Sequence, residues 1–297
     1  MKDLHPVVPI IYYAAVIGLS MFSDSPVFLI ASFIIGLVYG AYLRINEGEK
    51  EVGVKIIKNA IIMFFFFIFF GALINGLFTH NGATVLFFLG PNRITLEAFI
   101  YGAVMSLILS SVIIWFISFG IIMTSDKLIC VFGHFAPVIG LTISMIFRFV
   151  PLLRRRYKDI KMGQISLGRG NVKGPINKIK QITKELSILI SWSLEAAIES
   201  ADSMAARGYG LPGRSSYRLY AFRKRDGLII AVIVLLTVAT GTCFHLGACK
   251  IYYYPEIRFA GLSTPLIDLI AVISFIVLAF IPLIIDFCEE LRWKKSL

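Results

Sequence analysis

Two short segments of the chain each place an arginine directly before a glycine. The segment "SLGRGN" contains Arg169 and Gly170, and the segment "MAARGYG" contains Arg207 and Gly208. Glycine is common just past a helix C-terminus because it adopts left-handed backbone angles without strain, and a nearby cation complements the helix dipole. A guanidinium at such a helix end can also fork onto a carboxylate of another protein. A helix cap and a docking contact are therefore both open interpretations of each arginine.

The residues before both arginines have the spacing of amphipathic helices. In "QITKELSILISWSLEAAIESADSMAARG" (181–208) apolar residues recur at steps of three and four, which predicts one apolar helix face. An earlier helix is expected over "MIFRFVPLLRRRYKDIKMGQIS" (145–166) with a kink at Pro151, and Gly174-Pro175 separates the two helices. Two such helix ends on one chain suit a partner with two similar sites.

The composition marks a polytopic membrane protein. The 297 residues are 58% hydrophobic, and several apolar runs exceed the roughly 18 residues that indicate a membrane helix. The net charge of +11 arises within residues 148–226, which carry 17 Lys and Arg against 6 Asp and Glu. This basic block is interleaved with apolar residues and flanked by membrane spans. It therefore indicates a cytoplasmic segment beside the membrane, and we expect no nucleic-acid binding.

Six apolar runs predict an all-α membrane fold with about six transmembrane helices. The runs cover residues 7–22, 27–43, 56–78, 98–123, 227–244 and 264–287. We divide the chain into N-terminal transmembrane helices (1–135), a cytoplasmic-side pair of long amphipathic helices with the two Arg-Gly motifs (136–226), and C-terminal transmembrane helices (227–297). Residues 136–152 are compatible with a seventh, partly embedded helix. The distribution of Lys and Arg among the loops predicts that both termini are cytoplasmic.

The cysteines leave three interpretations open at one place. Cys130, Cys243, Cys249 and Cys288 form no CxxC pair, but Cys243 and Cys249 flank His245 near the end of a span. An ordinary helix end followed by a loop is the interpretation that we favour. A disulfide between these two cysteines and a metal site lacking a fourth nearby ligand are the alternatives.

The sequence around Arg207 resembles a known family of membrane subunits. In "ESADSMAARGYGLPGR" (199–214) the chain is similar to the T component of energy-coupling factor (ECF) transporters, the EcfT/CbiQ-like integral membrane proteins. Further similar stretches are "LHPVVPIIYY", "THNGATVLFFLGPNRITLEAFIYG", "IMTSDK" and "MIFRFVP". Family members carry two Ala-Arg-Gly signatures at the ends of cytoplasmic coupling helices. Here "AARG" matches the second signature, whereas "LGRG" has Gly168 where the first has alanine.

The resemblance implies partners, a location and site residues. Such a subunit would bridge two cytoplasmic ATP-binding-cassette ATPases and a membrane S component that binds a vitamin or a transition-metal ion, in a prokaryotic inner or plasma membrane. No cofactor is expected on this chain, because ATP and Mg²⁺ would bind to the partner ATPases. The resemblance implies ATPase docking at Gly168, Arg169, Gly170, Ala206, Arg207 and Gly208. Contact with the S component is expected at Leu186, Leu189, Ile190, Leu194, Ile198 and Met204, with contact to the lipid bilayer as the alternative for this apolar face.

The sequence contains weaker evidence for other classes of protein function. The sequence contains no GxxxxGK[ST], HExxH or GxSxG motif, so we expect a non-catalytic chain. A self-contained secondary transporter or channel is the main alternative, and it would need intramembrane charged pairs or broken helices in two symmetric halves. An intramembrane enzyme would need acidic or histidine clusters at cytoplasmic helix ends. The one acidic cluster there is "DFCEE" (286–290), and we expect nothing to pair with it.

One further arginine has two interpretations. Arg148 lies between apolar residues in "MIFRFVP". Because a charge at membrane depth is costly, such an arginine raises the question of a function. Extension of its guanidinium to the inner membrane surface is the simpler interpretation, and it is the one that we favour.

Overall fold

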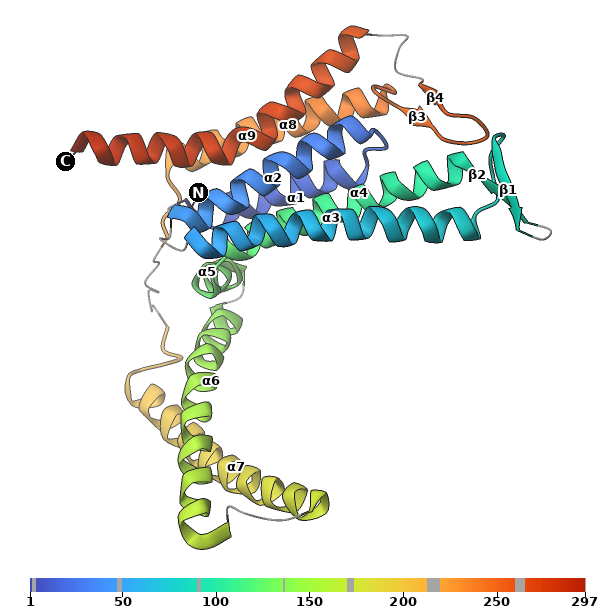
Figure 1. Ribbon diagram of the computed structural model, residues 1–297. Helices are drawn as coiled ribbons and strands as arrows, with labels where there is room; N and C mark the ends of the chain where they lie inside the picture. The colour runs from blue at the N-terminus through green and yellow to red at the C-terminus, as the bar shows by residue number, and fades with distance from the viewer. Residues whose placement is uncertain are drawn as a thin grey trace. The chain divides into compact units, whose positions relative to one another are not determined.

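The computed structural model describes residues 1, 4–46, 50–89, 92–135, 137–169, 174–212, 220–259 and 265–296. The chain divides into two compact units. Unit 1 comprises Met1–Thr124 with Tyr220–Leu297, and unit 2 comprises Ser125–Leu219. Both units are built mainly from helices, which confirms the all-α fold class (Figure 1).

Unit 1 contains the membrane-spanning helices. They are α1 (Val7–Met21), α2 (Pro26–Asn46), α3 (Lys50–Phe78), α4 (Leu96–Ile122), α8 (Lys224–His245) and α9 (Pro265–Ser296). Within the described ranges, all of these except α1 are long and apolar enough to cross a membrane. Helix α1 is apolar but has 15 residues. At 1.5 Å per residue it spans about 22 Å, less than the roughly 30 Å of a bilayer core. The six predicted spans therefore correspond to five full-length helices and one short apolar helix.

Aromatic side chains bury the short helix α1 inside unit 1. The rings of Tyr12 and Tyr13 both meet the ring of Trp115 on α4 edge to face, with centroids 6.0 Å apart in each pair. Tyr13 makes a further edge contact with Phe119 at 5.3 Å. Such pairs contribute about 0.5–1.5 kcal/mol each beyond the area they bury. Packing within the unit therefore compensates for the shortness of α1.

A buried hydrogen-bond cluster around Ser32 joins α1, α2 and α4. The Ser32 hydroxyl oxygen accepts hydrogen bonds from the Ser111 hydroxyl and from Trp115 Nε1, both at 2.9 Å. It also lies 3.0 Å from the Ser20 hydroxyl oxygen. Since two donors occupy the lone pairs of Ser32, its own proton points to Ser20. Polar bonds of this kind hold membrane helices together where lipid supplies no hydrophobic driving force between them.

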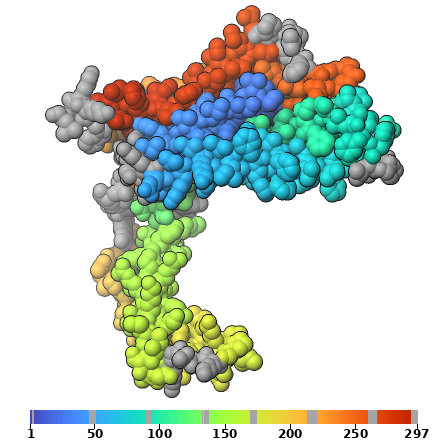
Figure 2. All heavy atoms as spheres, viewed as in Figure 1, coloured from blue at the N-terminus to red at the C-terminus, as the bar shows by residue number. Residues whose placement is uncertain are grey.

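Helix α3 lies at the surface of unit 1 and exposes a broad aromatic side. Figure 2 shows this helix in light blue along one face of the unit. Its exposed phenylalanines are Phe65, Phe66, Phe69, Phe70 and Phe78. An apolar helix with so much exposed surface fits contact with lipid acyl chains.

A β-hairpin lies between α3 and α4, in a segment for which the sequence predicts no secondary structure. Strands β1 (Val85–Leu89) and β2 (Asn92–Thr95) pair antiparallel, with Leu89 opposite Asn92. The Thr84 N–H donates to both carboxylate oxygens of Glu97, at 3.0 and 3.3 Å. This contact fixes the hairpin to the first turn of α4.

The loop between α8 and α9 forms a second, smaller hairpin of β3 (Ile251–Tyr252) and β4 (Arg258–Phe259). The Ala83 N–H donates to the Pro255 carbonyl at 2.9 Å and so joins the two hairpin segments. The Tyr253 hydroxyl donates to the Asp24 carbonyl at 2.8 Å. The loops at this end of unit 1 are therefore tied to one another.

The thiols near His245 are free. Cys243 is buried and Cys249 is half-buried, and neither forms a disulfide. Asp268 Oδ1 accepts the Cys249 backbone N–H at 2.8 Å. Burial, and then the charge and hydrogen bond of Asp268, raise the pKa of the Cys249 thiol to about 11. In the described ranges no three His, Cys, Asp or Glu side chains are grouped as metal ligands would be.

Unit 2 consists of α5 (Ser125–Phe135), α6 (Pro137–Gln164), a π-helical turn η1 (Ile165–Arg169) and α7 (Pro175–Ala206). The break at Gly174-Pro175 lies where the sequence predicts it. Helix α6 begins at Pro137 and not at Met145, and it continues through Pro151. The segment 136–152, considered as a separate embedded helix, therefore belongs from Pro137 on to the first long helix.

Replacement of Ser32 by alanine tests the buried cluster. Ser32→Ala leaves Trp115 Nε1 without its acceptor, and we expect the free energy of unfolding in detergent to fall by about 1–2 kcal/mol. The matched control is Ser118→Ala, because Ser118 is also buried but donates only within its own helix, to the Ile114 carbonyl. Thermal unfolding of both variants gives the comparison. Equal losses of stability would show that the bonds between helices add nothing.

The raised pKa of Cys249 predicts slow alkylation. At pH 8 a thiol with a pKa of about 11 reacts more than about a hundredfold more slowly than an ordinary cysteine, because the thiolate is the nucleophile. The rate should rise with pH up to about 11, and Asp268→Asn should move the profile to lower pH. Mass-spectrometric mapping of iodoacetamide labelling against pH measures this. A midpoint near that of free cysteine would contradict the burial of the thiol.

Candidate functional site

The second Arg-Gly segment ends α7 in a Schellman motif. The Tyr209 N–H donates to the Met204 carbonyl and the Gly208 N–H donates to the Ala205 carbonyl, each at 3.0 Å. Gly208 has a φ of 77°, a left-handed value that glycine adopts without strain. The Arg207 side chain is exposed and takes no part in these backbone bonds. The backbone cap therefore accounts for the glycine, whereas the arginine contributes only its charge near the C-terminal end of the helix dipole.

The first Arg-Gly segment is built differently. Helix α6 gives way to the π-helical turn η1, inside which Gly168 has a φ of 75°. A Cβ added at Gly168 would meet nothing within 4 Å, so backbone conformation and not packing requires glycine here. Gly168 precedes the arginine in this segment, whereas the left-handed Gly208 follows the arginine in α7. Gly170 and the side chain of Arg169 lie outside the described residues.

A polar contact connects α6 and α7. Glu185 is the one buried residue among those described in α7, with 2% of its surface exposed. Its carboxylate accepts a hydrogen bond from Gln181 Nε2 at 3.0 Å and pairs with the Tyr157 hydroxyl of α6. Burial, and then this hydrogen bond to Glu185, raise the pKa of Tyr157. Close by, the Arg156 guanidinium lies over the Trp192 ring, 5.0 Å from its centroid.

The apolar face predicted on α7 is divided between two sides of the helix. Four of its six residues form an exposed stripe at steps of four, namely Leu186, Ile190, Leu194 and Ile198. Leu189 and Met204 are half-buried, and Leu189 lies one helical turn beyond Glu185 on the side towards α6. Among the described residues of unit 2, no apolar side chain is fully buried. The exposed stripe therefore has no cover within the unit.

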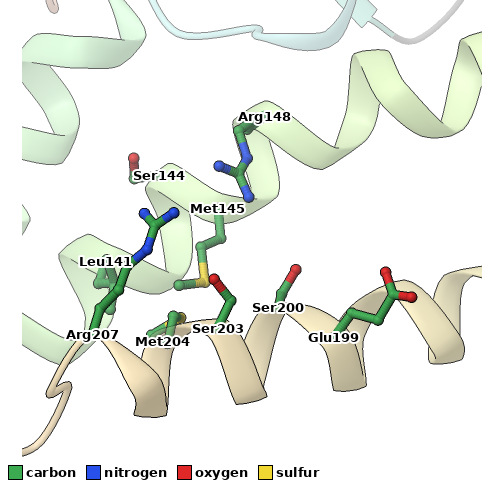
Figure 3. A pocket seen from close by; sticks show the side chains of 9 residues that line it. All are labelled: Leu141, Ser144, Met145, Arg148, Glu199, Ser200, Ser203, Met204 and Arg207. Atoms are coloured by element: carbon green, nitrogen blue, oxygen red, sulfur yellow. The ribbon is translucent and has the colours of Figure 1, made fainter.

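A cavity of about 510 Å³ lies between α6 and α7 at the Arg207 end. Its walls are formed by Leu141, Ser144, Met145 and Arg148 from α6 and by Glu199, Ser200, Ser203, Met204 and Arg207 from the end of α7. Figure 3 shows the side chains of Arg148 and Arg207 directed into the space between the two helices. The cavity thus combines guanidinium groups, hydroxyls and one carboxylate with an apolar patch.

These contacts make α6 and α7 antiparallel. Tyr157 near the C-terminal end of α6 meets Glu185 in the first half of α7, whereas Arg148 lies near the end of α7. The π-helical turn with Arg169 and the Schellman end with Arg207 are therefore at opposite ends of the helix pair (Figure 1).

The acidic cluster "DFCEE" on α9 is paired, against the expectation from the sequence. Asp286 accepts from the Tyr39 hydroxyl at 3.0 Å and contacts the Met1 amino group. Glu289 pairs with Arg225 Nη1 of α8 at 3.0 Å. Glu290 accepts from the Tyr42 hydroxyl at 3.2 Å. These carboxylates connect α9 to α2 and α8, which is a structural role.

Sequence reasoning missed the buried Glu185 and the placement of Arg148. A signal for Glu185 was present, since it lies four residues before Leu189 and therefore on the same helix face. For Arg148 no local signal exists. Its approach to Arg207 depends on the antiparallel arrangement of α6 and α7, which local periodicity does not specify.

Comparison with known proteins agrees with the resemblance seen in the sequence. No family model matches the chain. It is 39% identical over 100 residues to the energy-coupling factor transporter transmembrane protein EcfT of Lactobacillus helveticus, covering 33% of this chain and 36% of that protein. The EcfT proteins of Bacillus selenitireducens and Lactococcus lactis subsp. cremoris are 31% and 32% identical over 103 and 105 residues, each covering 34% of this chain and 38% of the relative.

The matched region spans about a third of the length of these curated relatives. The long apolar helices of unit 1 agree with a multi-pass membrane protein. The predicted resemblance of this chain to the transmembrane T component of ECF transporters is thereby confirmed.

Proposed function

We propose that the chain is the non-catalytic coupling subunit of an ECF-type importer. In this proposal two cytoplasmic ATP-binding-cassette ATPases bind ATP and Mg²⁺ and dock at the two Arg-Gly ends. A membrane S component carries a vitamin or a transition-metal ion. Both termini of the chain are cytoplasmic, and the membrane is a prokaryotic inner or plasma membrane. The observation that carries the proposal is the α6–α7 pair, which presents one arginine-bearing end in each direction and an uncovered apolar stripe between them.

The two ends support separate docking sites. Helix α7 has 32 residues, which is about 48 Å at 1.5 Å per residue. Because α6 and α7 are antiparallel, Arg169 and Arg207 are separated by a distance on the scale of a whole helix. One small partner domain would not reach both arginines, whereas a pair of related ATPases would engage one end each. The guanidinium of Arg207 is exposed and free of the cap's backbone bonds, so that it is available to a carboxylate.

The exposed stripe supports the S component as the partner on the membrane side. Leu186, Ile190, Leu194 and Ile198 are between 43% and 64% exposed and lie on one line along α7. A helix pair without a buried apolar core gains its stability from whatever covers such a stripe. A membrane protein that rests on α7 would bury these side chains, and its movement would follow that of the helix.

Arg207→Ala separates docking from capping. We expect this variant to release the co-expressed ATPases in mild detergent, because a charge-assisted contact is worth about 1.5–3 kcal/mol. Its thermal stability should be unchanged, since the cap's hydrogen bonds come from the backbone. Gly208→Ala is the matched variant, and it should lower stability by about 1–2 kcal/mol, because alanine is strained at left-handed angles.

Co-purification with the ATPases and measurement of substrate uptake give the two readouts. Arg169→Ala and the double variant complete the series. ATPase binding and uptake that persist in the double variant would mean that both Arg-Gly ends are only helix ends, and the coupling proposal would lose its support.

Ile190→Glu tests the stripe. A carboxylate buried against an apolar partner is costly, and we expect at least about a tenfold loss of co-purified S component while the ATPases remain bound. Ile188→Glu is the control, because Ile188 is also exposed but faces the other side of α7. If both variants retain the S component, the stripe contacts lipid instead.

A further inference from the structure

Two arginines share the cavity at the end of α7 without a partner that neutralises them. Arg148 of α6 and Arg207 of α7 both line it, and their side chains project into it from opposite walls (Figure 3). In the part of the chain that the structure describes, no carboxylate lies within 4.0 Å of either guanidinium. Like charges that face one another repel, and an anion placed between them would relieve this repulsion.

The remaining walls of the cavity suit a small anion. Ser144, Ser200 and Ser203 supply hydroxyl donors, and the guanidiniums supply two planar forks. Glu199 is the one acidic residue that lines the cavity, which leaves a net charge of +1 over the lining residues. One bound monoanion would balance this charge.

We infer that Arg148 and Arg207 together form a receptor for one carboxylate side chain of the docking partner. The inference rests on the proposed function, because it takes the ATPase as the source of that carboxylate. It adds Arg148 to the docking surface, although Arg148 lies far from both Arg-Gly motifs in the sequence. The partner's acidic side chain enters between α6 and α7 and accepts hydrogen bonds from both guanidiniums, so that docking fixes the end of α7 against α6.

Glu199 acts as an internal competitor in this arrangement. Its carboxylate lines the same cavity and lowers the positive potential that attracts the partner. Removal of its charge therefore strengthens docking, whereas removal of the Arg148 charge weakens it. Opposite signs from two neighbouring substitutions are not expected of a purely structural role.

Arginine-selective labelling tests the inference. Phenylglyoxal is applied to the full-length chain in detergent, alone and in complex with its co-expressed ATPase pair, and labelled peptides are mapped by mass spectrometry. We expect the ATPases to protect Arg148 and Arg207 but not Arg155, which is exposed on α6 and does not line the cavity. Arg148→Gln should weaken ATPase binding about tenfold, and Glu199→Gln should strengthen it about two- to fivefold. Arg155→Gln should leave binding unchanged.

The outcomes separate this inference from the proposed function. Failure of the wild-type chain to bind the ATPases at all would overturn both. Binding with protection of Arg207 and full labelling of Arg148 would overturn the two-arginine receptor alone. Labelling in the presence of phosphatidylglycerol vesicles forms the third arm. Protection of Arg148 by these vesicles and not by the ATPases would replace the carboxylate with a lipid phosphate.

Discussion

The contact between α6 and α7 is polar, and the behaviour of unit 2 follows from this. Glu185 is buried at the contact, hydrogen-bonded to Gln181 and Tyr157, while no described apolar side chain of the unit is fully buried. Helices usually gain their stability in proteins from burial of an apolar face. Here the apolar stripe of α7 is exposed, so the free energy that fixes the pair must come from the surfaces that cover it. The stability of unit 2 therefore depends on the protein or lipid that covers this stripe.

Unit 1 has the opposite design. Tyr12, Tyr13 and Trp115 pack edge to face between α1 and α4, and the Ser32 cluster gives Ser20, Ser111 and Trp115 Nε1 a hydrogen-bond partner. At one end, the carboxylates of α9 pair with groups on α2 and α8. Apolar interdigitation and closed hydrogen-bond clusters resist displacement. The polar contacts of Glu185 and of Arg156 with Trp192 resist it much less, because polar groups exchange such partners for water at small net cost. The chain thus combines a membrane unit held by its own core with a helix pair whose described residues form no such core.

The sequence predicts the secondary-structure elements better than it predicts how these elements pack against one another. Apolar run lengths identified the spans, the three-and-four periodicity identified α7, and Gly174-Pro175 identified the break before it. The hairpin of β1 and β2 was not predicted, because short strands with exposed phenylalanines have no sequence pattern that distinguishes them from a loop near the membrane. The left-handed conformation of Gly168 was not predicted, because the rule for helix ends does not distinguish between neighbouring glycines. The division of the α7 face and the approach of Arg148 to Arg207 arise from the antiparallel packing of two helices, and local periodicity does not contain that information.

The position of the polar contact along the two helices has a mechanical consequence. Glu185 lies about ten residues into α7, so that the longer part of the helix, which carries Ile190, Ile198 and Arg207, extends beyond it. A helix is stiff over this length, and a force applied at Arg207 is therefore transmitted along α7 to the exposed stripe. The stripe begins at Leu186 and continues to Ile198, so that it lies between the polar contact and the Arg207 end. A partner resting on the stripe is thereby placed on the part of the helix that carries this force.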